Sequence, residues 1–123
     1  MNIECLTENG IDIAVISSDE AVITDPQSAL DLIMSVKYET GAERAAIPKE
    51  LVCEEFFVLS TGIAGEILQK FINYHMKAAI YGDYSHYTSK PLQDIINDST
   101  QGKDIYFHAT RDEALQNMPR AQL

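Results

Sequence analysis

The chain has 123 residues, of which 46% are apolar and 23% are charged. This composition is that of one soluble globular domain, because it is too apolar for a disordered chain and the length leaves no room for a second domain of ordinary size. The formal net charge of -10, from 19 acidic and 9 basic side chains, repels nucleic-acid phosphates and anionic membrane surfaces, so neither is expected as a partner.

The first predicted element is an antiparallel hairpin. Residues 3–6 and 11–16 are two short apolar runs, and the polar stretch between them ends in Asn9-Gly10. This dipeptide supplies the positive backbone angles that a tight turn requires. We therefore expect two antiparallel strands at the start of the chain.

A helix is predicted next, between Asp25 and Gly41. Asp25 followed by Pro26 is typical of an N-cap with proline at the first helical position. Gly41 is typical of a helix end. The apolar residues between these limits fall on one helical face: Ala29, Leu32, Ile33 and Val36.

Three later apolar runs predict buried strands, at residues 44–47, 76–81 and 104–108. Between the first two runs, apolar side chains recur at helical spacing up to about Tyr74. Pro91 and Gly102 mark the expected limits of another helix before the last strand.

The last helix is predicted by Thr110 with Glu113 three residues later, which matches a capping box. Strands that alternate with crossover helices require a mainly parallel sheet. We therefore predict one α/β domain over residues 1–118, with a mostly parallel central sheet of about five strands, an N-terminal antiparallel hairpin and about four helices. Residues 119–123 are expected to form a flexible tail.

The two cysteines, Cys5 and Cys53, show neither C-x-x-C spacing nor a neighbouring histidine, which argues against a zinc site. We expect both to be buried free thiols in a reducing cytosol, because a chain of this size does not need a disulfide; the alternative is a disulfide between them. The chain begins without a basic region followed by an apolar core, and no run reaches the ~18 apolar residues of a membrane span. These features favour a cytoplasmic protein.

The most informative segment is Ser60-Thr61-Gly62-Ile63-Ala64-Gly65-Glu66-Ile67-Leu68, which places hydroxyl groups and glycines where a helix is expected to begin. It resembles the phosphoacceptor segment of STAS domains, Asp-Ser-Ser-Gly-Leu-Gly followed by apolar residues, and the order of elements is also similar to that family of anti-sigma-factor antagonists. The resemblance implies a STAS-like fold with Thr61 at the place of the phosphorylated serine. The chain departs from the pattern in having Leu59 in place of the aspartate and a longer, more helical stretch over residues 47–60.

A second resemblance covers nearly the whole chain. The motifs that carry it are Tyr38-Glu39-Thr40-Gly41, Cys53-Glu54-Glu55-Phe56-Phe57, Ala64-Gly65-Glu66-Ile67-Leu68-Gln69-Lys70-Phe71 and Tyr87-Thr88-Ser89-Lys90. These motifs are similar to those of the bacterial domain-of-unknown-function family 4180. The resemblance implies no particular activity.

Ser60 and Thr61 form the first candidate site. A helix N-terminus presents free backbone N–H groups that favour anions, so Thr61, or Ser60, is a candidate phosphoacceptor. The alternative is that the hydroxyl only caps the helix by accepting a hydrogen bond from one of these N–H groups.

The second candidate site is a ligand pocket beyond the carboxyl ends of the parallel strands, where ligands bind in such sheets. The residues expected to line it are Glu54, Glu55, Asp83, Tyr84, His86 and Tyr87. The alternative is structural, with Asp83 and Ser89 capping turns and the two tyrosines covering the edge of a helix.

A hydrolytic reaction would need His86 as base, Asp83 to orient it, and Ser85 or Thr61 as nucleophile. The sequence carries no G-x-S-x-G motif to support this arrangement. The three histidines are His75, His86 and His108, and their spacing fits none of the common zinc motifs. No catalytic residue, metal or other cofactor is therefore assigned.

These patterns favour a regulatory or protein-interaction module with Thr61 at its switch surface and an unidentified protein as partner. The alternative is a small-ligand-binding protein or minor enzyme that uses the pocket at the carboxyl edge of the sheet. Apolar side chains left over on the helices, Tyr38, Phe56 and Phe57, are expected to support a homodimer.

Overall fold

A single five-stranded sheet forms the centre of the computed structural model, which describes residues 1–85, 90 and 105–117. Its strands are β1 (Asn2–Glu8), β2 (Ile11–Ser17), β3 (Arg44–Pro48), β4 (Lys77–Tyr81) and β5 (Ile105–His108), and they lie in chain order. β1 and β2 are antiparallel, and every other neighbouring pair is parallel. The predicted hairpin and the predicted mostly parallel sheet are therefore confirmed.

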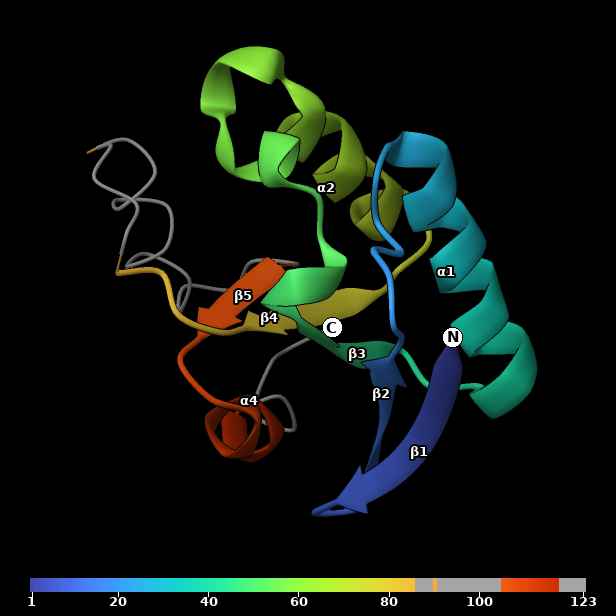
Figure 1. The fold of residues 1–123 in the computed structure, drawn as a ribbon. Coiled ribbons are helices and arrows are strands. Elements are labelled where there is room, and N and C mark those ends of the chain that lie inside the picture. The colour runs from blue at the N-terminus through green and yellow to red at the C-terminus, as the bar shows by residue number, and fades with distance from the viewer. Residues whose placement is uncertain (86–89, 91–104, 118–123) are drawn as a thin grey trace.

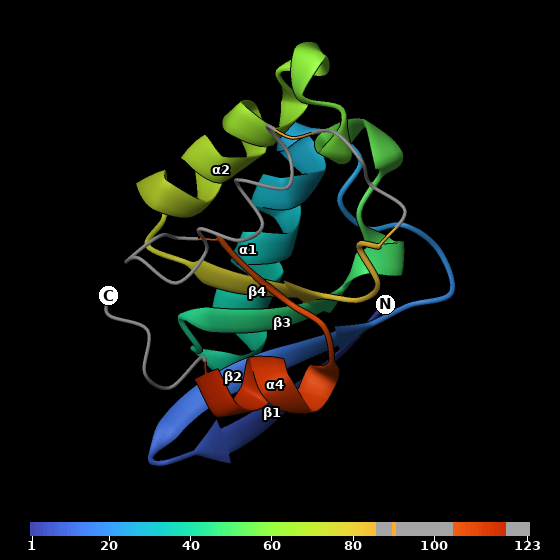
Figure 2. The same ribbon diagram turned by 90° about the vertical axis from the view of Figure 1, so that its left-hand side faces the viewer.

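Helices cover both faces of the sheet. α1 (Pro26–Thr40) and α2 (Ile63–Asn73) pack on one face, and the short α4 (Arg111–Asn117) packs on the other (Figures 1 and 2). Three 3₁₀ turns lie between β3 and α2: η1 (Lys49–Leu51), η2 (Glu54–Phe57) and η3 (Leu59–Thr61). The described part of the chain thus has three α-helices, and the helix expected over residues 91–102, like the expected tail, lies outside the described residues.

The local signals in the sequence fix the first elements as expected. Asn9 and Gly10 both have positive φ angles, 52° and 80°, which gives the tight turn between β1 and β2. At the start of α1, the Ser28 N–H donates to Asp25 Oδ1 (2.7 Å) and the Asp25 N–H donates to Ser28 Oγ (3.0 Å). Gly41 ends the helix in the left-handed conformation, with a φ of 73°.

The central strands are buried on both faces, as parallel strands usually are. At the middle of β3 and β4, successive alanines face the two layers: Ala45, Ala46, Ala78 and Ala79. Ala45 and Ala78 belong to the larger core, which includes residues of α1 and α2. Ala46 and Ala79 belong to the smaller core, which includes residues of α4.

A bridge outside the main sheet holds the connection after β2 against the segment after β3. Ile23 pairs with Val52, the Ile23 N–H donates to the Leu51 carbonyl (3.0 Å), and the Cys53 N–H donates to the Ile23 carbonyl (2.9 Å). This bridge orients the 3₁₀ turns beyond the carboxyl end of β3.

Two expectations about surface residues are wrong. Both thiols are free, but Cys5 is exposed and Cys53 is partly exposed, because β1 is an edge strand and the segment after Val52 lies at the surface. Phe56 and Phe57 are each only 4% exposed and belong to the core, so they are not available to a homodimer, whereas Tyr38 is 92% exposed. Within the described residues, no helix is long and apolar enough to cross a membrane.

Candidate functional site

The carboxyl ends of β3, β4 and β5 meet at one edge of the sheet. Pro48 is in register with Tyr81, and Tyr81 is in register with His108, so the last residues of the three strands are neighbours. In open α/β sheets this edge is the usual place of a ligand. The structure therefore brings together residues that are up to 60 positions apart in the chain.

Gly82 allows the strand ends to approach one another. Its N–H donates to the His108 carbonyl (3.0 Å), and its φ is 157°. A Cβ atom at this position would lie 2.7 Å from the Cβ of Lys49, which is closer than non-bonded carbon atoms can approach. Glycine is thus required here for Lys49 to pack over the end of β4.

Lys49 connects this edge to the predicted pocket residue Glu54. Its side chain is only 13% exposed, with Nζ 3.8 Å from Glu54 Oε1 and 5.3 Å from the centre of the Phe57 ring. The carboxylate and the aromatic face both favour the ammonium charge. Glu55, in contrast, is exposed on η2, and its backbone carbonyl is used by Thr61.

Tyr84 is tied into the core below this edge. Its hydroxyl donates to the Ile80 carbonyl (2.6 Å), and its ring packs against Phe57 (6.0 Å between centres) and Phe107 (5.7 Å). Asp83 Oδ1 accepts a hydrogen bond from the Ser85 N–H (2.9 Å), as the turn-capping alternative expects. Glu54 and Tyr84 are therefore joined through Phe57, while the other predicted pocket residues, His86 and Tyr87, lie outside the described residues.

His108 is the site residue that sequence reasoning missed. It is 8% exposed, and its Nδ1 lies 3.5 Å from Oε1 of Glu113 on α4. A carboxylate at that position favours the tautomer with the proton on Nδ1, which leaves a lone pair on Nε2. Nε2 itself is buried and has no hydrogen-bond partner among the described residues.

The sequence signal for this arrangement was present but was assigned to capping. The Glu113 N–H donates to Thr110 Oγ1 (3.1 Å), as the capping box predicts. The Glu113 carboxylate, however, lies at His108. A glutamate at this position of a helix can thus serve a neighbouring strand as well as the cap.

Tyr81 stands beside His108 on the face of the sheet that α4 covers. Burial raises the pKa of the Tyr81 hydroxyl above its usual value, the positive charge of Arg111 opposes this shift, and the carboxylate of Glu50 adds to it. Arg111 and Glu50 therefore act on the same hydroxyl. The edge presents one phenol, one guanidinium and one imidazole that come from three separate segments.

Thr61 lies two residues before α2 rather than in its first turn. The N-cap of α2 is Gly62, with a φ of 76°. The Thr61 hydroxyl lies 2.8 Å from the Val58 carbonyl and 3.0 Å from the Glu55 carbonyl, toward which it donates, and it accepts from the Ile63 N–H (3.3 Å). The last bond is the capping role, and the first two tie η3 to Val58 and to Glu55 of η2. Ser60 is exposed beside it.

Within the described ranges, no three His, Cys, Asp or Glu side chains are grouped so that they could hold a metal ion. A family model for a domain of unknown function, DUF4180, matches residues 8–118. This range includes every residue of the site described above. No curated protein and no solved structure matches the chain.

Proposed function

We propose that this protein, which belongs to the DUF4180 family, binds a small polar molecule at the carboxyl edge of its sheet. The observation that carries the proposal is the buried Nε2 of His108, which has no hydrogen-bond partner among the described residues. A buried polar atom left without a partner costs about 1–3 kcal/mol. A ligand that donates a hydrogen bond to this atom would recover that cost.

The surroundings of His108 support a ligand with both donor and acceptor groups. Glu113 Oε1 lies 3.5 Å from Nδ1, and in the neutral imidazole with its proton on Nδ1 the other nitrogen, Nε2, is the acceptor. Tyr81 is in register with His108, the charge of Arg111 acts on the Tyr81 hydroxyl, and both of these side chains are hydrogen-bond donors. We therefore propose a small molecule that donates to His108 and accepts from Tyr81 or Arg111.

Replacing His108 by phenylalanine is expected to abolish ligand binding without unfolding the protein. The phenyl ring fills the space of the imidazole, is slightly larger, and removes the unpaired nitrogen, so the free energy of unfolding should change little. The measurement is a thermal-shift screen of wild type and H108F against amino acids, nucleosides and small carboxylic acids, because a ligand of the folded state raises the melting temperature.

The matched control is His75→Asn. His75 is exposed and has a φ of 55°, a conformation that asparagine tolerates. Compounds that stabilise wild type and H75N but not H108F support the proposal. A screen in which every stabilising compound acts equally on all three proteins contradicts it.

The second candidate function is the STAS-like switch at Thr61, in a regulatory or protein-interaction module. It is favoured by the position of the hydroxyl of the exposed Thr61, which lies within hydrogen-bond distance of two carbonyls of the preceding segment. A phosphate there would remove these donated hydrogen bonds and place negative charge near Glu55. The segment that carries Glu54 toward Lys49 would then be released.

This switch predicts phosphate on Thr61 after incubation with cell lysate and ATP, detected by mass spectrometry of the intact protein and its peptides. Thr61→Val should lose the modification and about 1 kcal/mol of unfolding free energy, because it loses the hydroxyl hydrogen bonds. Ser60→Ala is the control, with the modification kept and the stability little changed. Phosphate on neither residue in repeated lysates would argue against the switch.

A further inference from the structure

β1 ends the sheet with an open edge. It pairs with β2 over all seven of its residues, from Asn2 with Ser17 to Glu8 with Ile11, and the described residues place no strand on its other side. Proteins usually protect such an edge with charged side chains, lysine above all, with proline or with a bulge, and the charged residues of β1 are Glu4 and Glu8. β1 contains no proline and no lysine, and its register with β2 is continuous.

The hairpin turn determines which backbone groups face outward. With a two-residue turn at Asn9-Gly10, Glu8 and Ile11 form a hydrogen-bonded pair, and hydrogen-bonded and non-hydrogen-bonded pairs alternate from there. Glu8, Leu6, Glu4 and Asn2 thus direct their backbone groups toward β2. Ile3, Cys5 and Thr7 direct theirs toward the open edge.

We propose that two copies of this chain associate through β1, antiparallel, about a two-fold axis at Cys5, so that their sheets join. In this register Cys5 faces the partner subunit's Cys5, and Ile3 faces the partner subunit's Thr7. Glu4 faces the partner subunit's Leu6, and Glu8 faces the partner subunit's Asn2. No carboxylate lies opposite another carboxylate.

The neighbouring registers are less favourable because of their charges. Moving the axis by one residue, to Glu4 or to Leu6, also matches the outward backbone groups. An axis at Glu4 places Glu4 opposite its own copy, and an axis at Leu6 places Glu4 opposite Glu8, and like charges directly opposite one another destabilise a strand pair. Axes further out, at Ile3 or Thr7, pair fewer residues of β1, so the register about Cys5 is the longest one that keeps the glutamates apart.

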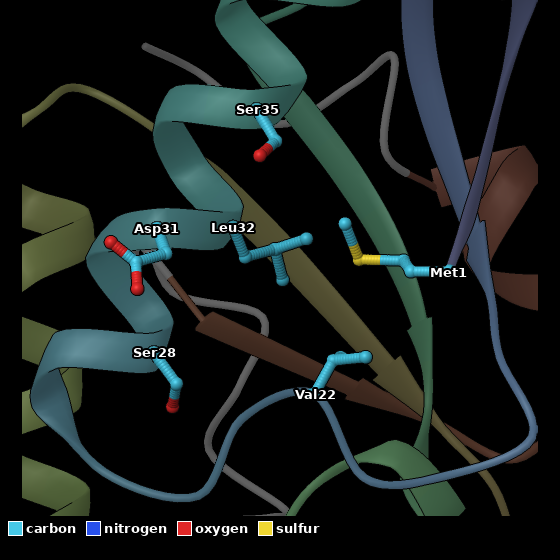
Figure 3. Close-up of a pocket in the computed structure, with 6 residues that line it drawn as sticks. All are labelled: Met1, Val22, Ser28, Asp31, Leu32 and Ser35. Atoms are coloured by element: carbon cyan, nitrogen blue, oxygen red, sulfur yellow. The ribbon is translucent and has the colours of Figure 1, made fainter.

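The layer of helices leaves room beside β1 for a neighbouring strand. A hollow of about 250 Å³ lies between α1 and the start of β1 (Figure 3). Its lining residues are Met1, Val22, Ser28, Asp31, Leu32 and Ser35. Met1, Ile3, Cys5 and Thr7 alternate with the other residues of β1 and lie on the face of the sheet that α1 covers. The corresponding side chains of a paired β1 would lie on the same face.

The charge of the whole molecule acts against this association. Each copy carries a formal charge of -10, and repulsion between two such bodies is screened by salt over about 10 Å at 0.1 M. Dimerisation through the strand edge should therefore strengthen as the salt concentration rises. An association driven by opposite charges would show the reverse.

The test uses substitutions at Asn2, which is exposed. In the symmetric dimer each Asn2 faces Glu8 of the partner subunit, so every substitution changes two contacts. Asn2→Lys creates two opposite-charge pairs and should lower the dimer dissociation constant, whereas Asn2→Glu creates two like-charge pairs and should raise it. With two pairs per dimer, the expected change is up to about thirtyfold in each direction. The measurement is sedimentation equilibrium of the full chain over a range of concentrations.

Gln116 provides the control for net charge, because it is exposed on α4, on a different part of the molecule. Gln116→Lys and Gln116→Glu change the net charge by the same amounts as the Asn2 variants. Their dimer dissociation constants should differ from each other much less than those of the two Asn2 variants. Equal effects at the two positions would contradict the β1 register. A chain that stays monomeric at every concentration and salt level would overturn the proposal. The open edge of β1 would then be the binding surface of a different protein.

A second measurement uses the position of Cys5 on the axis. The Cα atoms of a hydrogen-bonded antiparallel pair are about 5.5 Å apart, within the range of a disulfide. In a Cys53→Ser background, diamide should remove two electrons and two protons from the two Cys5 thiols and give a covalent dimer, which accumulates faster at high salt. Cys5→Ser with Cys53 retained is the control, and a similar yield of covalent dimer from it would overturn the proposal.

Discussion

Replacing Phe57 by alanine is expected to lower the free energy of unfolding by about 3–5 kcal/mol. The ring is 4% exposed, and its centre lies 5.1 Å from that of Phe56 and 6.0 Å from that of Tyr84. Removing it leaves a cavity below the carboxyl edge and also removes the aromatic face over which Lys49 lies. Denaturant unfolding of the purified protein measures the loss.

The adjacent Val58 is the matched control, because it is 49% exposed and lies in the same turn region. Val58→Ala should change the unfolding free energy by no more than about 0.5 kcal/mol. If the two variants lost the same stability, Phe57 would not be the centre of the aromatic cluster that supports the site.

Gly82→Ala is expected to destabilise the protein by about 1–3 kcal/mol. The new Cβ would lie 2.7 Å from Lys49 Cβ and 3.3 Å from Lys49 Cδ, so the end of β4 or the side chain of Lys49 has to move. The backbone at Gly82, with a φ of 157°, also disfavours a side chain. Because Gly82 follows Tyr81 and its N–H donates to the His108 carbonyl, a ligand held by Tyr81 and His108 should also bind more weakly.

Gly65→Ala, in the first turn of α2, is the control with the opposite sign. A Cβ atom at Gly65 meets nothing within 4 Å, and alanine restricts the unfolded chain, so a gain of about 0.4–1 kcal/mol is expected. The two variants are compared by thermal and denaturant unfolding. A gain at both positions would show that the strand ends at Gly82 are not as closely packed as described.

The elements that sequence reasoning located well are those with local causes. The turn at Asn9-Gly10, the N-cap at Asp25 and the C-cap at Gly41 each depend on residues within one turn, and each is confirmed. The segment between β3 and α2 was harder, because its apolar residues are spaced as in a helix. There Gly62 adopts the left-handed conformation and prevents one continuous helix. The structure has separate 3₁₀ turns before α2 begins.

Burial was predicted less well than secondary structure. Cys5 was expected inside because it stands in an apolar strand, yet β1 is at the edge, and only the order of the strands determines that. Phe56 and Phe57 were expected on a surface, yet the bridge between Ile23 and Val52 brings their segment over the sheet. Both outcomes depend on contacts between distant segments.

The candidate site was predicted in part for the same reason. The carboxyl edge followed from the parallel strands, and Glu54 and Tyr84 do share the aromatic cluster around Phe57. His108 could not be singled out, because its burial and its contact with Glu113 depend on α4 packing across the far face of the sheet. Nothing in the spacing of the histidines indicates that packing.

The four central alanines of β3 and β4 have a mechanical consequence. Alanine has the smallest side chain that contains a Cβ atom, so the helices on both faces pack close to the backbone of β3 and β4. The packing leaves no space for a larger side chain. A larger side chain at any of these four positions would therefore force a layer of helices away from the strands.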